Sequence, residues 1–282
     1  MKLLSYSFQG SRSWGALVDD RIVDLQAASG GRLPTLRSAL SSGSLAELER
    51  LAASREASIA LAETVLLPVV PDPPRIFCVG LNYEEHRVEA KRERTGHPTL
   101  FLRVGASQVG HGQAIVLPKE SGALDYEGEI AVVIGRPGRR ISEADAWEHV
   151  AGYAPYNDGS VRDWQSHTTQ WTPGKNFPAT GAFGPWMVTR GEVSDGQALS
   201  LTTRLNGQTV QHATTEQLIF PIPRLISYIS SFTGLEPGDV IVTGTPGGVG
   251  FKRQPPLFMR PGDVVEVEVG GVATLVNEVR AE

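Results

Sequence analysis

The stretch that decides the fold is Leu124-Asp125-Tyr126-Glu127-Gly128-Glu129-Ile130-Ala131-Val132-Val133-Ile134-Gly135. Glu127 and Glu129 stand two residues apart, so on a strand their side chains point to the same face. The five apolar residues that follow are typical of a strand buried on both faces. Two carboxylates at the entrance to such a strand repel each other unless a cation joins them, and Mg²⁺ or Mn²⁺ suits oxygen ligands. The alternative is an edge strand with ordinary solvent-facing acids.

The rest of the chain after residue 75 is also rich in strand signals. Residues 201–205, Asn206-Gly207 and residues 208–211 predict a hairpin with a type I′ turn. Near the end, Val265, Val267 and Val269 alternate with glutamates before a Gly270-Gly271 turn. Residues 142–150 and 224–232 have the spacing of short helices. This pattern predicts a mixed α+β fold that is mainly β.

The first seventy residues predict a small leading module. Residues 3–8, 14–18 and 21–25 have strand character, and residues 45–52 have apolar side chains at helical spacing. Residues 67–74 contain four prolines and predict a linker, because proline continues neither a helix nor a central strand. We therefore predict a small α+β domain over residues 1–70 and a larger domain over residues 71–282.

Composition narrows the class of protein. The chain has 282 residues and a formal net charge of -5, with no block of lysine or arginine, which argues against a nucleic-acid partner. The single cysteine, Cys78, lies in an apolar run and is interpreted as a buried core residue rather than a nucleophile. Without a disulfide or a long apolar stretch, we expect no membrane partner and a cytoplasmic protein.

A second polar cluster lies at residues 156–165. Asp158 is a candidate third metal ligand, Arg162 is placed to hold a substrate carboxylate by two hydrogen bonds, and Gln165 is placed to orient it. The alternative is that Asn157-Asp158-Gly159 is only a turn, which is the commonest use of that tripeptide.

His86 and Glu89 form a third candidate group. Residues three apart on a helix lie on one face, and a carboxylate beside a histidine orients its ring for accepting a proton. The same spacing is common on solvated helices, so a surface role is the alternative. The other histidines are interpreted as structural or surface residues: His97, His111, His149, His167 and His212.

Several motifs together resemble the fumarylacetoacetate hydrolase family, in the family's order, from about residue 75 to the end. They are Phe77-Cys78-Val79-Gly80-Leu81-Asn82-Tyr83, Glu127-Gly128-Glu129, residues 157–165 with Arg162-Asp163, Thr243-Gly244-Thr245-Pro246-Gly247-Gly248-Val249-Gly250 and Pro261-Gly262-Asp263-Val264-Val265-Glu266-Val267. The resemblance implies the family's mixed β-roll, in a homodimer. Residues 1–70 resemble, more weakly, the small N-terminal module of longer members.

The resemblance also implies roles for residues. Glu127, Glu129 and Asp158 would bind the metal, which would be Mg²⁺, with Mn²⁺ or Ca²⁺ as alternatives. Lys175 matches the active-site lysine, and Thr245 matches a threonine whose turn lines the pocket. The segment around His86 and Glu89 matches a lid that closes over the metal when substrate binds; residues 84–97 are called the lid segment below.

Three features depart from the family pattern or stand apart from it. Arg103 stands where lysine is usual, which would alter recognition of a substrate carboxylate. Asn82 stands near the position of an acidic fourth ligand, so we expect three protein ligands. Residues 164–171 are rich in aromatic side chains and are expected to shape the pocket. The sequence has no Gly-x-Ser-x-Gly elbow, phosphate-binding glycine loop or Cys-x-x-Cys pair.

These observations predict a metal-dependent hydrolase that cleaves a carbon–carbon bond in an acylpyruvate or related 2,4-dioxo acid, within aromatic or sugar acid catabolism. His86, held by Glu89, would deprotonate a water, and Lys175 would stabilise the oxyanion that forms. The first alternative keeps the site but changes the reaction to decarboxylation, hydration or tautomerisation of a 2-oxo acid. The second is a binding protein without catalytic activity, against which the complete set of site residues argues.

Overall fold

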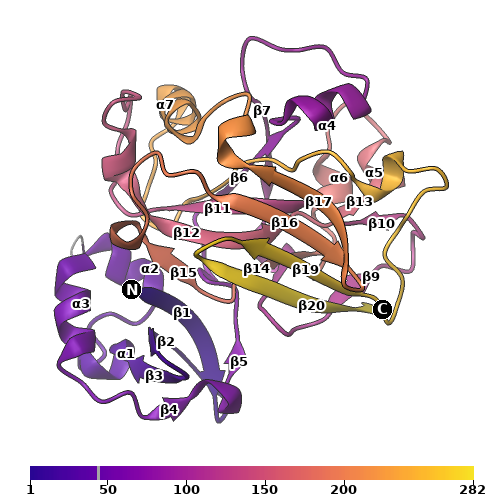
Figure 1. Ribbon diagram of the computed structural model, residues 1–282. Coiled ribbons are helices and arrows are strands. Elements are labelled where there is room, and N and C mark those ends of the chain that lie inside the picture. Colours follow the sequence, from indigo (N-terminus) through magenta and orange to yellow (C-terminus); the bar gives the residue numbers. More distant parts are fainter. Residues whose placement is uncertain (43–44) are drawn as a thin grey trace.

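The computed structural model describes residues 1–42 and 45–282, in which two large sheets pack face to face (Figure 1). A third, two-stranded sheet pairs β10 (Leu124–Asp125) with β13 (Ser160–Val161). The larger sheet runs, in spatial order, through β4 (Ile59–Ala60), β3 (Arg21–Asp24), β2 (Ser11–Val18), β1 (Lys2–Phe8), β15 (Met187–Thr189), β12 (Val150–Asn157), β11 (Gly128–Ile134), β18 (Val240–Val242), β6 (Ile76–Gly80) and β7 (Thr99–Arg103). β5 (Val65–Leu66), β8 (Gln108–Val109) and β14 (Gly181–Phe183) join it off this path. The prediction of a mixed, mainly β fold is confirmed.

The second sheet supplies the other layer of the core. Its order is β17 (Gln208–Thr214), β16 (Ser200–Leu205), β19 (Val264–Val269), β20 (Ala273–Ala281) and β9 (Ile115–Leu117). In Figure 1 the orange and yellow strands of this sheet, β16, β17, β19 and β20, lie across β11 and β12. Val265, Val267 and Val269 point into the core, as their alternation with glutamate predicts. The predicted hairpin is present, with Asn206 and Gly207 at φ 52° and 76° in the turn.

The strand β11 is buried along its whole length because both its faces are covered. Ile130, Val132 and Ile134 belong to the core cluster that is shared with the second sheet. Ala131 and Val133 point the other way, into a cluster that includes side chains of the first seventy residues. A strand covered on both faces has no solvent-facing positions, which explains the continuous apolar run.

The N-terminal strands extend the larger sheet. β1 pairs with β15, with Lys2 opposite Val188. Val69 and Val70 in the proline-rich segment are buried, and Ser5 Oγ donates a hydrogen bond to the Val69 carbonyl oxygen at 2.8 Å. The predicted linker is therefore a packed segment in the structure, and the domain division at residue 70 stays a prediction.

The helices are few and short. They are α1 (Leu25–Ala28), α2 (Leu36–Ser41), α3 (Leu45–Ala53), α4 (Glu84–Glu89), α5 (Arg162–Gln165), α6 (Thr172–Lys175) and α7 (Ile222–Phe232). The helix expected over 142–150 is only a 3₁₀ turn, η3 (Ala146–His149), because Val150 already enters β12. Within the described residues, no helix is long and apolar enough to cross a membrane.

Candidate active site

Three buried carboxylates converge where β11 begins and β12 ends. Glu127 directly precedes β11, Glu129 lies within it, and Asp158 follows β12. The antiparallel register places Gly128 opposite Asn157, and the Asp158 amide donates to the Glu127 carbonyl oxygen at 2.8 Å. One oxygen from each of the three carboxylates lies within 4.8 Å of the others. The sheet register thus brings together the three acids that the sequence singled out.

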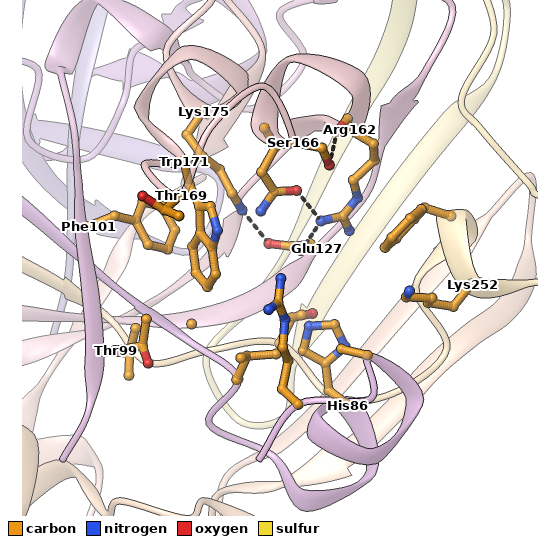
Figure 2. Close-up of a pocket in the computed structure, with 18 of the residues that line it drawn as sticks. His86, Thr99, Phe101, Glu127, Arg162, Ser166, Thr169, Trp171, Lys175 and Lys252 are labelled. Carbon is orange, nitrogen blue, oxygen red and sulfur yellow. Dashed lines mark hydrogen bonds and ion pairs between the residues drawn. The ribbon is translucent and has the colours of Figure 1, made fainter. Parts of the chain in front are cut away.

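Cationic side chains surround two of the three acids. Lys175 Nζ donates to Glu127 Oε2 and to Asp158 Oδ2, both at 2.6 Å. Arg162 Nη1 lies 2.7 Å from Glu127 Oε1, and Arg103 donates to Asp158. Figure 2 shows Lys175 and Arg162 both reaching Glu127. Glu127 and Asp158 are therefore balanced by fixed positive charge.

The electrostatic environment of Glu129 is different. Burial would raise the pKa of Glu127, but Arg162 and Lys175 outweigh burial and hold that pKa well below its usual range. For Glu129, burial raises the pKa, and Asp158 and Glu127 raise it further. The hydrogen-bond donor to its carboxylate is the Gly244 amide. Two neighbouring carboxylates thus have pKa values displaced in opposite directions by their partners.

This donor set fits a hard divalent cation. The three ligand residues are carboxylates, which Mg²⁺ and Mn²⁺ prefer, and Glu129 has no ion-pair partner in the part of the chain that the structure describes. A cation between Glu127, Glu129 and Asp158 would relieve the repulsion that raises the pKa of Glu129. The triad is the one cluster of His, Cys, Asp and Glu with this spacing among the described residues.

His86 and Glu89 lie on α4 at the edge of the same pocket. His86 Nδ1 is 3.4 Å from Glu89 Oε2, and the His86 side chain is buried and lines the pocket with Glu127 and Glu129. The Gly248 amide donates to the Glu89 carboxylate at 3.3 Å. Glu89 therefore contacts both the histidine and the glycine-rich turn of residues 245–250.

The pocket has a volume of about 700 Å³ and an aromatic wall. Phe101 and Trp171 lie at 5.4 Å between ring centroids, and in Figure 2 they stand to the left of Glu127, with Lys252 to the right. The stretch 164–171 lines the pocket mainly with polar residues and with Trp171, whereas its other tryptophan, Trp164, lies outside the lining. Thr245 also lines the pocket and donates to the Gly128 carbonyl oxygen at 2.9 Å.

Arg103 and Arg162 are engaged by protein groups. Arg103 is buried behind Asp158, where it also donates to the Gly159 carbonyl oxygen at 2.9 Å, and it is outside the pocket lining. Arg162 donates from Nε to Asp125 Oδ2 at 2.8 Å and from Nη1 to Gln165 Oε1 at 3.0 Å. The structure thus places these arginines, which the sequence assigned to a substrate carboxylate, against the protein's own acids.

Asn82, Cys78 and the five other histidines lie outside the pocket lining. The Asn82 amide donates to the Thr243 carbonyl oxygen at 2.8 Å, so it supports the threonine-glycine turn. Cys78 is buried in β6 and unpaired, as predicted.

The sequence analysis did not identify Asp125 and Gln211 as site residues. Asp125 is fully buried and accepts hydrogen bonds from Arg162 and from the amides of Gly250 and Phe251. Gln211 accepts from the Gly128 amide and donates to Thr245 Oγ1 at 2.8 Å. Asp125 adjoins the paired glutamates, so its position in the sequence could have indicated a role in the site. Gln211 lies in a hairpin strand, where nothing in the local sequence indicates such a role.

The sequence of this chain is similar to those of known proteins of one family. Residues 75–280 match the family described as fumarylacetoacetate (FAA) hydrolase C-terminal. The chain is 38% identical to a Dictyostelium discoideum protein named fumarylacetoacetate hydrolase domain-containing protein 2 homolog, across 96% of this chain and 93% of that protein. It is 40% identical to the human mitochondrial oxaloacetate tautomerase FAHD2A, across 77% of this chain and 70% of that protein.

Solved structures also place this chain beside proteins of that family. Fumarylacetoacetate hydrolase from Exiguobacterium antarcticum superposes with a TM-score of 0.84 at 30% identity, with both chains fully covered. Maleylpyruvate hydrolase from Sphingobium sp. SYK-6, in complex with manganese(II) and pyruvate, superposes with a TM-score of 0.82 at 27% identity, covering 100% of this chain and 99% of that one. This chain therefore belongs to the fumarylacetoacetate hydrolase family and is an enzyme of that family.

Proposed function

We propose that this enzyme catalyses a metal-dependent reaction of a 2-oxo acid, with keto–enol tautomerisation of a 2-oxo diacid such as oxaloacetate as the leading reaction. The observation that carries the proposal is the buried Glu127, Glu129 and Asp158 triad, which opens into the same pocket as His86. These three residues would hold a divalent ion, which would supply Lewis acidity toward a 2-oxo group.

The protein's own residues would move the proton. In the tautomerisation, the enol O–H proton is lost and carbon 3 of the substrate gains one. His86 is the residue that we assign to this transfer, because it lines the pocket and its ring lies against the Glu89 carboxylate. Glu89 would orient the ring and stabilise its protonated form.

Hydrolysis of a carbon–carbon bond in an acylpyruvate is the second candidate. It needs His86 to deprotonate a water and a further group to stabilise an oxyanion, for which Lys175 was predicted. Lys175 donates to Glu127 and Asp158 at 2.6 Å each, so two of its three N–H groups are engaged. This geometry, and the 40% identity to an oxaloacetate tautomerase, favour tautomerisation; the similarity to a maleylpyruvate hydrolase keeps hydrolysis as the alternative.

The deciding experiment measures both reactions with one preparation. Purified protein with Mg²⁺ or Mn²⁺ is assayed for the ultraviolet absorbance decay of enol-oxaloacetate and for pyruvate release from acylpyruvates. We expect faster tautomerisation than the metal-only background, and no acceleration with Glu129→Gln or Asp158→Asn. Pyruvate release without tautomerisation would select the hydrolase, and inactivity toward both would refute the proposal.

Three further expectations accompany this function. We propose Mg²⁺ or Mn²⁺ as the metal, a homodimer as the assembly and the cytoplasm as the location, within catabolism of aromatic or sugar acids. Metal analysis of the purified protein tests the first, and light scattering of the metal-loaded protein tests the second. The metal would be held by Glu127, Glu129 and Asp158.

A further inference from the structure

The pocket carries cations that the metal-site carboxylates do not use. Lys91 and Arg92 lie in the lid segment just after α4, and Lys252 ends the 3₁₀ turn η6 (Gly250–Lys252); all three line the pocket. Across residues 1–42 and 45–282, the ion pairs include none of these three side chains. Arg162 and Lys175, by contrast, are paired with buried acids.

Lys252 stands on backbone that is fixed by the buried acid Asp125. The Gly250 and Phe251 amides donate to Asp125 at 2.9 and 3.0 Å, and Lys252 Nζ lies 4.1 Å from the centroid of the Phe251 ring. Burial lowers the pKa of Lys252, and the positive charges of Lys91 and Arg162 lower it further. A half-buried ammonium that faces other cations would gain from a nearby anion.

The acids of this region leave that charge only partly balanced. The negative charge of Glu89 raises the pKa of Lys252, but the Glu89 carboxylate also contacts His86 and the Gly248 amide. Glu93 lines the same pocket as the cations. The part of the pocket near Lys252 thus has more positive than negative groups, which suits an anionic substrate group.

We propose that Lys252, together with Lys91 and Arg92 of the lid segment, binds a second carboxylate of the substrate, distant from the 2-oxo acid group held at the three-carboxylate site. This inference rests on the proposed function and assigns the residues that would select a 2-oxo dicarboxylic acid over a 2-oxo monocarboxylic acid. Because Lys252 is on anchored backbone and the other two cations are on the lid segment, the same carboxylate would draw the lid segment toward η6. A second acid group would therefore promote closure over His86.

The test compares ligands that differ only at the far end. 2-Oxoglutarate and 2-oxopentanoate have the same chain length, and so do 2-oxoadipate and 2-oxohexanoate, but only the first of each pair carries a terminal carboxylate. Calorimetry with Mg²⁺-loaded protein gives the four dissociation constants. We expect at least one diacid to bind about tenfold more tightly than its matched monoacid, as one charged hydrogen bond predicts.

Substitutions test which residues cause the tighter binding of diacids. Lys252→Ala should bring the ratio of the two dissociation constants close to one, and Lys252→Arg should keep part of the preference. The double variant Lys91→Ala, Arg92→Ala should reduce it as well. Lys119→Ala is the matched control, because Lys119 is exposed and outside the pocket lining. Monoacid binding should change little in any variant, which also shows that each variant is folded.

The outcomes separate this inference from the proposed function. Equal binding of diacids and monoacids to the unaltered protein, or a preference that survives Lys252→Ala, would overturn the second carboxylate site alone. Failure of all four ligands to bind with Mg²⁺ would overturn the proposed function, and the second site with it. Metal-dependent binding of both classes with a diacid preference lost in Lys252→Ala supports both.

Discussion

Asp125 holds Arg162 in place beside the three-carboxylate site. Arg162 Nε donates to Asp125 Oδ2 at 2.8 Å, while Arg162 Nη1 lies 2.7 Å from Glu127 Oε1. Asp125 also accepts hydrogen bonds from the amides of Gly250 and Phe251, so through Arg162 one buried carboxylate connects Glu127 with the turn that carries Lys252. Asp125 is a positioning residue in this arrangement.

Asp125→Asn should destabilise the protein. The change leaves the buried Arg162 guanidinium without one of its charged partners, and breaking a buried pair costs about 3–5 kcal/mol. Urea unfolding of the metal-free protein measures the loss. The control is Asp195→Asn, whose pair with Arg190 is partly exposed and should cost less than about 1 kcal/mol. Equal losses in the free energy of unfolding would show that the buried Asp125–Arg162 pair stabilises the protein no more than the partly exposed Asp195–Arg190 pair.

Glu129 should make the stability of the metal-free protein dependent on pH. A carboxyl whose pKa is raised on folding stabilises the folded state below its unfolded pKa of about 4.3, and that contribution is lost as pH rises through the folded pKa. Stability should therefore fall as pH rises from that value through the raised pKa of Glu129. Glu129→Gln should flatten this slope, with the exposed Glu120→Gln as control.

Added Mg²⁺ should reverse that effect, because metal binds the ionised carboxylate. The melting temperature of the unaltered protein at pH 8 should rise with Mg²⁺, and that of Glu129→Gln should rise much less. Thermal unfolding with and without a chelator measures both. A Mg²⁺ gain of the same size in the variant would remove Glu129 from the ligand set.

His86→Ala should separate base-dependent reactions from decarboxylation. Tautomerisation and hydrolysis both need a base in the pocket, so either rate should fall about 10²–10⁴-fold. Loss of CO₂ from oxaloacetate needs an electron sink rather than a base, so it should fall much less. Both activities are measured in one preparation, with His212→Ala as the control on an exposed strand position. Equal losses in the two reactions would argue against His86 as the base.

The lid segment should exchange its amide hydrogens more slowly when ligand binds. Beyond α4 most of it is exposed, and its contact with the rest of the site includes the 3.3 Å hydrogen bond from the Gly248 amide to Glu89. Few buried contacts imply frequent local opening without ligand. Oxalate with Mg²⁺ should slow exchange over residues 84–97, and oxalate with a chelator should not. Unchanged exchange at saturating ligand would contradict closure.

The sequence by itself determined the features that depend on local pattern. The apolar run after Glu129 predicts a doubly covered strand, the two-residue spacing of Glu127 and Glu129 predicts their convergence, and the Asn206-Gly207 turn predicts a hairpin. These follow from the period of a strand and the φ values that a turn requires, so they need no knowledge of distant residues. The family motifs are also short stretches of sequence, so they identified the three acids without knowledge of the fold.

Only the tertiary structure decided which charges meet. Arg103 and Arg162 had the chemistry to bind a substrate carboxylate, yet the sheet register places them against Asp158 and against Asp125 and Glu127. These partners are 35 to 55 residues away in sequence, and local spacing carries no information about such contacts. The opposite displacement of the Glu127 and Glu129 pKa values has the same origin: two identical side chains two residues apart differ because Arg162 and Lys175 reach only one of them closely.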